Sequence, residues 1–231
     1  ILGDICTRGC RYCAVSKGKP LQLDQEEPHR VAEAVEVMKL KHAVVTSVDR
    51  DDVSDGGVEI FARTIGAIRE RNPECVVEVL IPDFQGSKAA LDKVLEAAPE
   101  VLAHNIETVP RLFSKARAGG DYLRSLELLD RAHEWVPEVV TKTGMMLGLG
   151  EKNDEIYQVL EDLREKKVRI LTLGQYLRPT LWHLPVVRHY HPDEFQFWKE
   201  VGEGMGFDHV ESGPLVRSSY LAERQFASVG N

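Results

Sequence analysis

Short apolar runs rich in β-branched residues alternate along this chain with longer segments in which apolar residues recur every three or four positions. The runs that predict strands cover residues 1–5, 43–47, 76–81, 101–105, 139–147 and 169–176. The segments that predict helices cover residues 29–39, 58–69, 87–97, 121–134 and 154–166. The last of these places four apolar residues on one helical face, namely Ile156, Val159, Leu160 and Leu163.

Strands that alternate with helices of ~10–15 residues predict βαβ units on a parallel sheet, with right-handed crossovers. Six units are too few to close an eight-stranded barrel. The expected fold is therefore α/β, a partial (β/α)6 TIM-type barrel over residues 1–176. Residues 177–231 are expected to form a C-terminal extension that packs on the barrel mouth. They begin with a loop rich in Pro, His and Arg and continue into a helix at 192–204.

The composition is that of an ordinary core-forming protein. Hydrophobic residues make up 43% of the 231 positions, and 29 basic against 37 acidic residues give a net charge of −8. This charge argues against a bulk attraction to nucleic acid or to a membrane. No apolar run approaches the ~20 residues of a membrane span, and no signal peptide is evident. With free cysteines, this predicts a reducing compartment, hence the cytoplasm, or an organelle in a eukaryotic source. The opening Ile-Leu-Gly-Asp, without Met, leads us to expect an N-terminally incomplete chain.

Three cysteines stand close together in CTRGCRYC, a C-x3-C-x2-C spacing formed by Cys6, Cys10 and Cys13. Iron–sulfur clusters normally take four cysteine ligands, so a triplet leaves one iron open to another ligand. Structural zinc is the alternative, with His29 as the fourth ligand. The remaining cysteine, Cys75, leads into an apolar run and is expected to be a small buried hydrophobe.

The triplet, with Tyr12 before its last cysteine, resembles the signature of the radical SAM enzymes. Further blocks in chain order resemble the lipoyl synthase family. They are TSVDRDD with DGG, HNIETVPR, TKTG through GLGE, LGQYL, HLPV and SGPLVRSSY. Three departures stand beside them: Arg11 where the family usually has Pro, Trp182 before His183, and Leu221 after Tyr220.

The resemblance implies a radical SAM sulfurtransferase that inserts two sulfur atoms, at carbons six and eight, into a protein-bound octanoyl-lysine to form the lipoyl group. It implies two [4Fe-4S] clusters and S-adenosylmethionine (SAM). Cys6, Cys10 and Cys13 would ligate the SAM-binding cluster. Ser218 would ligate an auxiliary cluster that donates sulfur and whose three cysteines are missing from this chain. Serine is a poor ligand beside thiolate, which suits an iron that must be released.

For SAM binding, the expected residues are Thr46, Ser47, Asn105, Glu107, Arg124 and Ser125. Arg178, His183 and Arg188 are expected to face the substrate-bearing domain. The implied partners are octanoylated lipoyl domains or the glycine cleavage H protein, and an electron donor such as ferredoxin or flavodoxin. Nucleic acid and membranes are not expected as partners. The chain is expected to be a monomer. Two alternatives remain open at this point: another radical SAM sulfur-inserting enzyme, and a zinc-stabilised binding module.

Overall fold

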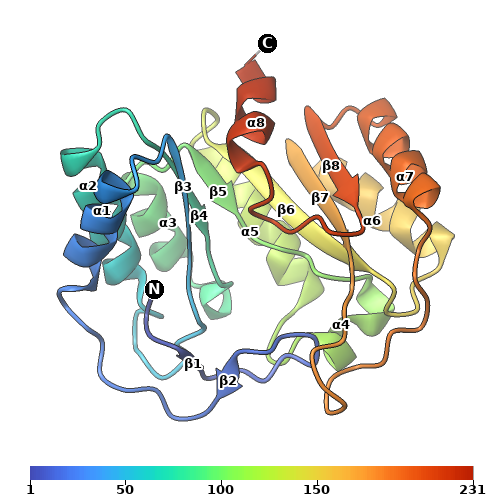
Figure 1. Ribbon diagram of the computed structural model, residues 1–231, viewed down its shortest axis with the longest axis horizontal. Coiled ribbons are helices and arrows are strands. Elements are labelled where there is room, and N and C mark those ends of the chain that lie inside the picture. The colour runs from blue at the N-terminus through green and yellow to red at the C-terminus, as the bar shows by residue number, and fades with distance from the viewer. Residues whose placement is uncertain (231) are drawn as a thin grey trace.

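A computed structural model, which describes residues 1–230, shows six parallel strands that pair in chain order. They are β3 (His42–Thr46), β4 (Val76–Leu80), β5 (Val101–Ala103), β6 (Val140–Leu147), β7 (Ile170–Gln175) and β8 (His209–Gly213). The sheet is curved, and within residues 1–230 the outer edges of β3 and β8 pair with no further strand. The barrel is therefore partial and open (Figure 1). The predicted α/β partial barrel is confirmed.

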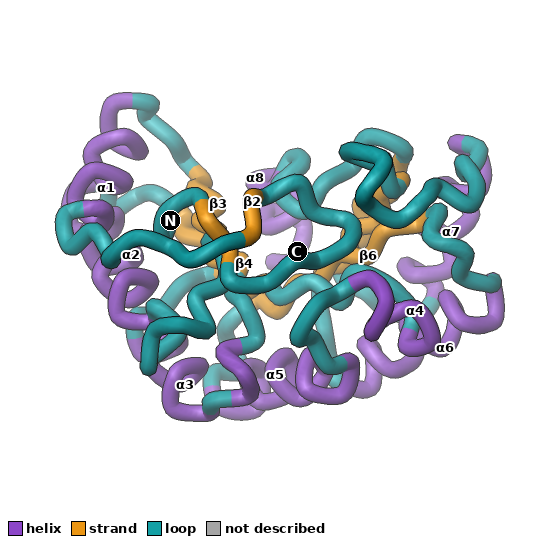
Figure 2. The backbone as a smooth tube through the Cα atoms, turned by 90° about the horizontal axis from the view of Figure 1, so that it is seen from below, coloured by secondary structure: helices purple, strands orange, loops and turns teal. Residues whose placement is uncertain are grey.

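Helices cover the outer face of this sheet. Those that follow the first strands are α1 (Glu27–Val37), α2 (Val58–Arg71), α3 (Lys88–Glu96), α4 (Pro110–Ala116) and α5 (Tyr122–Trp135). The later ones are α6 (Asn153–Glu165), α7 (Pro192–Gly204) and α8 (Ala222–Ala227), with two single-turn helices, η1 (Phe84–Gly86) and η2 (Ser228–Gly230). Figure 2 shows helices α1 to α7 as an arc outside the strands, whereas α8 lies near the centre of the view. Because the strands are covered on both faces, β7 is buried at every position.

The predicted helical faces form the contacts that close this core. Ile156, Val159, Leu160 and Leu163 of α6 are all fully buried, as the period of three and four residues predicts. Each of the predicted helices is present, with ends that differ by a few residues. None of the helices within residues 1–230 is long and apolar enough to cross a membrane.

The prediction of a first barrel strand at residues 1–5 is wrong. Only Ile5–Cys6 (β1) is extended there, and it pairs with Ser16–Lys17 (β2) in a separate two-stranded sheet. Leu2 and Gly3 have φ of 69° and 90°, a left-handed conformation that a strand does not allow. Leu2 instead inserts its side chain into the core, where it packs beside Gly57.

The sixth strand is β8, which the sequence did not predict because Val210 is its one buried residue. It lies in the segment that was predicted to be an extension, so the sheet continues past residue 176. The division into two domains stays a prediction. Helix α4 was also missed; it is only seven residues long and begins at Pro110.

The two ends of the barrel are occupied by the two ends of the chain. The segment with β1 and β2 crosses the carboxyl ends of the strands (Figures 1 and 2). Helix α8 lies at the opposite end, where it contacts both edge strands, β3 and β8. Its Phe226 packs edge-on against His42 of β3 at 6.0 Å between ring centroids. Functional groups are therefore expected at the end that the cysteine segment covers.

Candidate functional site

The three cysteines of the predicted triplet line one cavity of about 290 Å³ at the carboxyl ends of β3 to β5. All three thiols are free and partly buried. The Sγ of Cys6 lies 3.4 Å from two backbone N–H donors, those of Arg8 and Asp49. The loop therefore presents its sulfurs to a shared space and surrounds them with backbone donors, as iron–sulfur sites require.

Burial raises the pKa of the Cys10 and Cys13 thiols. Backbone N–H groups of Ala118 and Val15 act in the opposite direction, as does the charge of Arg117 near Cys10. A metal ligand must be a thiolate, so metal binding at these sulfurs releases protons.

Two observations bear on zinc as the alternative metal. Among residues 1–230, no three His, Cys, Asp or Glu side chains converge on a point that could hold a single metal ion. His29 is exposed on α1 and does not line the cavity of the cysteines. A cubane cluster makes a different demand, because each thiolate binds a different iron and the sulfurs stand apart around it. Three sulfurs around one cavity fit such a cluster.

Arg8 anchors the cysteine loop to the barrel. Its side chain is only 6% exposed and forms ion pairs with Asp49 (3.0 Å), Asp51 (2.7 Å) and Asp83 (2.8 Å). Burial raises the pKa of Asp83, but its ion pairs with Arg8 and Arg124 outweigh this effect and lower it to about 2. Burial raises the pKa of Asp49 to about 7; the charge of Arg8 acts in the opposite direction, and the neighbouring carboxylates of Asp51 and Asp83 add to the rise.

Four of the six residues predicted to bind SAM meet in the same cavity as the cysteines. Thr46 ends β3 and Ser47 follows it, whereas Asn105 and Glu107 follow β5. The Oγ of Ser47 and the Oδ1 of Asn105 are buried without a hydrogen-bond partner. Buried polar atoms are rarely left unpaired, so these two atoms fit a polar ligand in the cavity.

The other two residues, Arg124 and Ser125, lie on α5 and do not line this cavity. Arg124 pairs with Asp83 at 2.8 Å. Ser125 is fully buried; its hydroxyl donates to the Asp121 carbonyl and lies 3.1 Å from Nε2 of His104. The structure therefore gives both of them contacts that position other residues.

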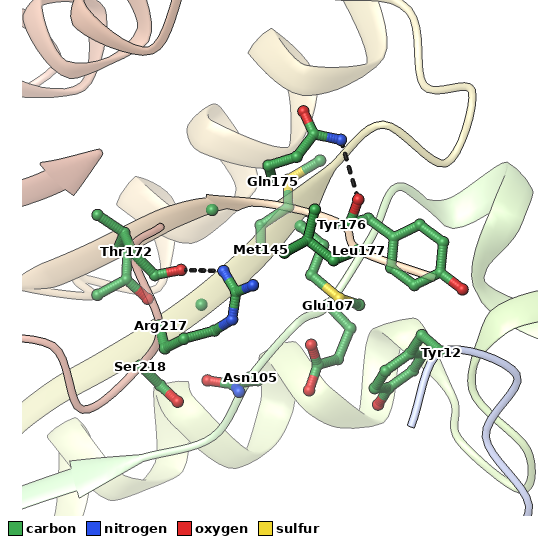
Figure 3. Close-up of a pocket in the computed structure, with 14 residues that line it drawn as sticks. Tyr12, Asn105, Glu107, Met145, Thr172, Gln175, Tyr176, Leu177, Arg217 and Ser218 are labelled. Carbon is green, nitrogen blue, oxygen red and sulfur yellow. Dashed lines mark hydrogen bonds between the residues drawn. The ribbon is translucent and has the colours of Figure 1, made fainter. Parts of the chain in front are cut away.

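A second cavity, of about 180 Å³, adjoins the first and contains Ser218. The two cavities share Tyr12, Asn105 and Glu107, and Figure 3 shows Glu107 between the other two. The remaining lining residues come mainly from β6, β7 and the segment before Ser218: Gly144, Met145, Met146, Thr172, Gly174, Gln175, Tyr176, Leu177, Val216 and Arg217. Ser218 thus lines a cavity that shares three lining residues with the cavity of the cysteines.

The backbone of Glu107 adopts a left-handed conformation, with φ of 66°, which is strained for a residue with a side chain. Two bonds to β6 hold it: its N–H donates to the Gly144 carbonyl, and its carbonyl accepts from Met146, each at 2.9 Å. Burial raises the pKa of its carboxyl group. The conformation turns this carboxyl into the wall that both cavities share (Figure 3).

The three residues predicted to face a substrate domain are engaged within the chain. Arg188 pairs with Glu194 at 2.8 Å, and Arg178 donates to the His183 carbonyl at 2.9 Å. His183 is buried and bonds to the carbonyl of Cys13. Sequence reasoning missed Arg117, which lines the cysteine cavity, and the methionines of the second cavity. Only the position of the methionines near the carboxyl end of β6 could have indicated them.

A partial parallel barrel with three cysteines in the loop across its carboxyl ends defines a radical SAM protein. The model of the Radical SAM superfamily matches residues 1–163. Members of this superfamily hold a [4Fe-4S] cluster and SAM, and the donor set described above fits both.

Curated relatives identify the family within this superfamily to which the chain belongs. The chain is 59% identical over 96% of its length to the lipoyl synthase of Chloroflexus aggregans and covers 72% of that protein. It is 54% identical over 97% of its length to the lipoyl synthase of Shouchella clausii and covers 73% of it. The chain belongs to the lipoyl synthase family, whose members are radical SAM sulfur-inserting enzymes.

Solved structures agree on the fold. The maturase HydG superposes with a TM-score of 0.71 at 18% identity, over 98% of this chain and 53% of that one. SuiB of Streptococcus suis, bound to S-adenosylmethionine, gives 0.67 at 11% identity, over 86% of this chain and 44% of that one. At these identities the likeness shows the partial barrel alone.

Proposed function

We propose that this chain inserts two sulfur atoms, at carbons six and eight, into an octanoyl chain carried on a lysine of a partner protein. The partners would be octanoylated lipoyl domains or the glycine cleavage H protein, with ferredoxin or flavodoxin as electron donor. Cys6, Cys10 and Cys13 would hold the [4Fe-4S] cluster. Bound cluster and SAM together supply a carbon-centred radical that can remove hydrogen from an unactivated carbon.

Within this proposal the chain itself binds, orients and encloses. Thr46 and Ser47 would offer hydroxyl groups, and Asn105 and Glu107 an amide and a carboxyl group, to the polar parts of SAM. The raised pKa of the Glu107 carboxyl suits a buried hydrogen-bonding group. Met145, Leu177 and Val216 give the second cavity an apolar lining that fits an alkyl chain.

The observation that carries the proposal is the common wall of the two cavities. An alkyl chain in the second cavity would have the cysteine cavity on one side and Ser218 on another, with Asn105 and Glu107 lining both spaces. We propose that Ser218 ligates an auxiliary [4Fe-4S] cluster whose remaining three ligands come from outside these 231 residues. The one other cysteine of the chain, Cys75, is buried at the start of β4 and cannot supply them.

The first experiment tests the cluster ligands. Cys6→Ala, Cys10→Ala and Cys13→Ala should each lose the brown colour and the bound iron of the anaerobically reconstituted chain. Cys75→Ala is the matched control and should keep both, because Cys75 lies outside the cavity. Iron retained in all three triplet variants would contradict the assignment.

The second experiment tests sulfur insertion in an enzyme form that includes the additional cysteines. Wild type, incubated anaerobically with SAM, reductant and an octanoyl-lysine peptide, should release 5′-deoxyadenosine and add two sulfurs by mass. Ser218→Ala should still cleave SAM but give no thiolated product. Iron analysis should find about eight atoms, since each cubane holds four. One cluster in that form, or full product from Ser218→Ala, would refute the sulfur-donor assignment.

A further inference from the structure

The segment after β7 crosses the cysteine loop. We call residues 177–184 the strap; it follows Tyr176, whose hydroxyl donates to the carbonyl of Leu184 at 2.7 Å. The N–H of Leu184 in turn donates to the Arg11 carbonyl at 2.8 Å. In Figure 1 the orange strap and the blue amino-terminal segment meet below α4. Two segments some 170 residues apart in sequence are thus joined beside the cysteines.

Side chains add to this junction. The guanidinium of Arg11 donates to the Trp182 carbonyl at 2.8 Å and lies 4.9 Å from the centre of the Trp182 ring. His183 points inward, is 7% exposed, and bonds through Nε2 to the Cys13 carbonyl at 2.8 Å. The strap therefore contacts the backbone of a cysteine that lines the cavity.

The surroundings of His183 fix its tautomer. The Thr180 hydroxyl lies 2.8 Å from Nδ1, and the Oγ1 of Thr180 also accepts from the Trp182 N–H. The carbonyl of Cys13 can only accept, so Nε2 carries the hydrogen and Nδ1 accepts from Thr180. Nε2 of His183 therefore donates one directed hydrogen bond to the cysteine loop.

Little apolar burial holds the exposed turn of the strap in place. Leu181 is 87% exposed and Trp182 is 55% exposed. Hydrogen bonds carry much of the attachment at this turn, and the bond from His183 is the one that reaches a cysteine. The Cys6 sulfur is held differently, by the N–H groups of Arg8 and Asp49, and does not depend on the strap.

We propose that His183 is a positioning residue for Cys13. Its bond to the carbonyl fixes the peptide that follows Cys13, and the next turn of chain brings the Val15 N–H to the Cys13 sulfur. Loss of His183 frees that peptide and exposes the thiol. The role in catalysis rests on the assignment of Cys13 as a cluster ligand, but the first test below does not.

That test measures how fast iodoacetamide alkylates each thiol of the metal-free chain, resolved by peptide mass. In His183→Ala, Cys13 should react about five-fold faster than in wild type, the factor that one hydrogen bond of about 1 kcal/mol gives. The rates of Cys6 and buried Cys75 should be unchanged. His183→Gln, whose amide is a donor of similar reach, should restore the slow rate.

A milder variant keeps the test valid if His183→Ala does not fold, which rapid labelling of Cys75 would reveal. Thr180→Val removes the hydroxyl that contacts Nδ1 of His183, at an exposed position, and should raise the Cys13 rate by a smaller factor. An unchanged Cys13 rate in both variants would overturn the proposal, as would equal acceleration of Cys6 and Cys13 in a folded variant.

The reconstituted chain gives a second readout. The electron paramagnetic resonance spectrum of the reduced cluster should change in His183→Ala and be retained in His183→Gln, because N–H···S bonds tune such clusters. An unchanged spectrum together with altered alkylation would refute the link to the cluster while leaving cluster ligation itself intact. Loss of cluster from all variants, and from wild type, would instead refute the proposed function.

Discussion

Acidification should destabilise the fold through one buried histidine, His104. Its Nδ1 lies 2.9 Å from the Ile81 carbonyl, and Nη2 of Arg117 lies 3.1 Å from its Nε2. A proton on Nε2 of His104 would face the positively charged guanidinium of Arg117, and Nε2 could then no longer accept a hydrogen bond from it. Burial, followed by the charge of Arg117, lowers the pKa of His104 to about 3.

The sign and size of the effect follow from this pKa. Between the unfolded pKa of 6.5 and the folded value of about 3, the unfolded chain binds the extra proton and the folded chain does not. Stability is therefore complete above the unfolded pKa and falls as pH falls through this range. At about pH 5 the loss from His104 alone is about 2 kcal/mol, since each unit is worth about 1.4 kcal/mol.

Urea denaturation of the metal-free chain at about pH 8 and about pH 5 would measure this loss. His104→Asn is the control, because its amide keeps a donor for the Ile81 carbonyl but takes up no proton. The variant should be less stable at pH 8, from lost packing, yet lose about 2 kcal/mol less than wild type on acidification. Equal losses in the two proteins would refute the reasoning.

Two further perturbations test the barrel interior and the second cavity. Lys142 and Glu78 form a fully buried ion pair at 2.7 Å, so Lys142→Met should lower the free energy of unfolding by about 3–5 kcal/mol. Adding Glu78→Gln should recover part of this loss, because it removes the unpaired buried carboxylate. Additive losses of stability in the double variant would contradict this expectation. A Cβ at Gly174 would collide with the Val216 carbonyl oxygen, so Gly174→Ala should displace the segment before Ser218. SAM cleavage should persist while thiolated product falls at least ten-fold, and unchanged product formation would show that the segment tolerates the shift.

The sequence predicted the helices well because their faces are continuous in the chain. In α6, four apolar residues at helical spacing determine both the helix and what it buries. Strand β8 escaped prediction because pairing with β7, rather than its own composition, makes it a strand. The predicted strand at residues 1–5 is absent for a different reason: its backbone forms a left-handed turn at Leu2, and this one side chain enters the core.

The site was predictable where a loop carries its own chemistry. The cysteines and the residues at the ends of β3 and β5 meet in one cavity, as the positions of their strands imply. The sequence could not show that Arg124 and Ser125 lie outside this cavity, because their contacts with Asp83 and His104 depend on how α5 packs. The contact between His183 and Cys13 joins distant segments and has no local signal.

The backbone of Glu107 has a thermodynamic consequence. Its position is set by β6, whose Met145 and Met146 line the second cavity, while its carboxyl group also lines the first. A ligand that favours one position of this residue from either side changes the affinity of the other side. Linkage requires the two changes to be equal. Under the proposed function, an acyl chain that tightens SAM binding would itself be bound more tightly by the SAM-loaded enzyme, and weaker SAM binding without substrate would limit radical formation.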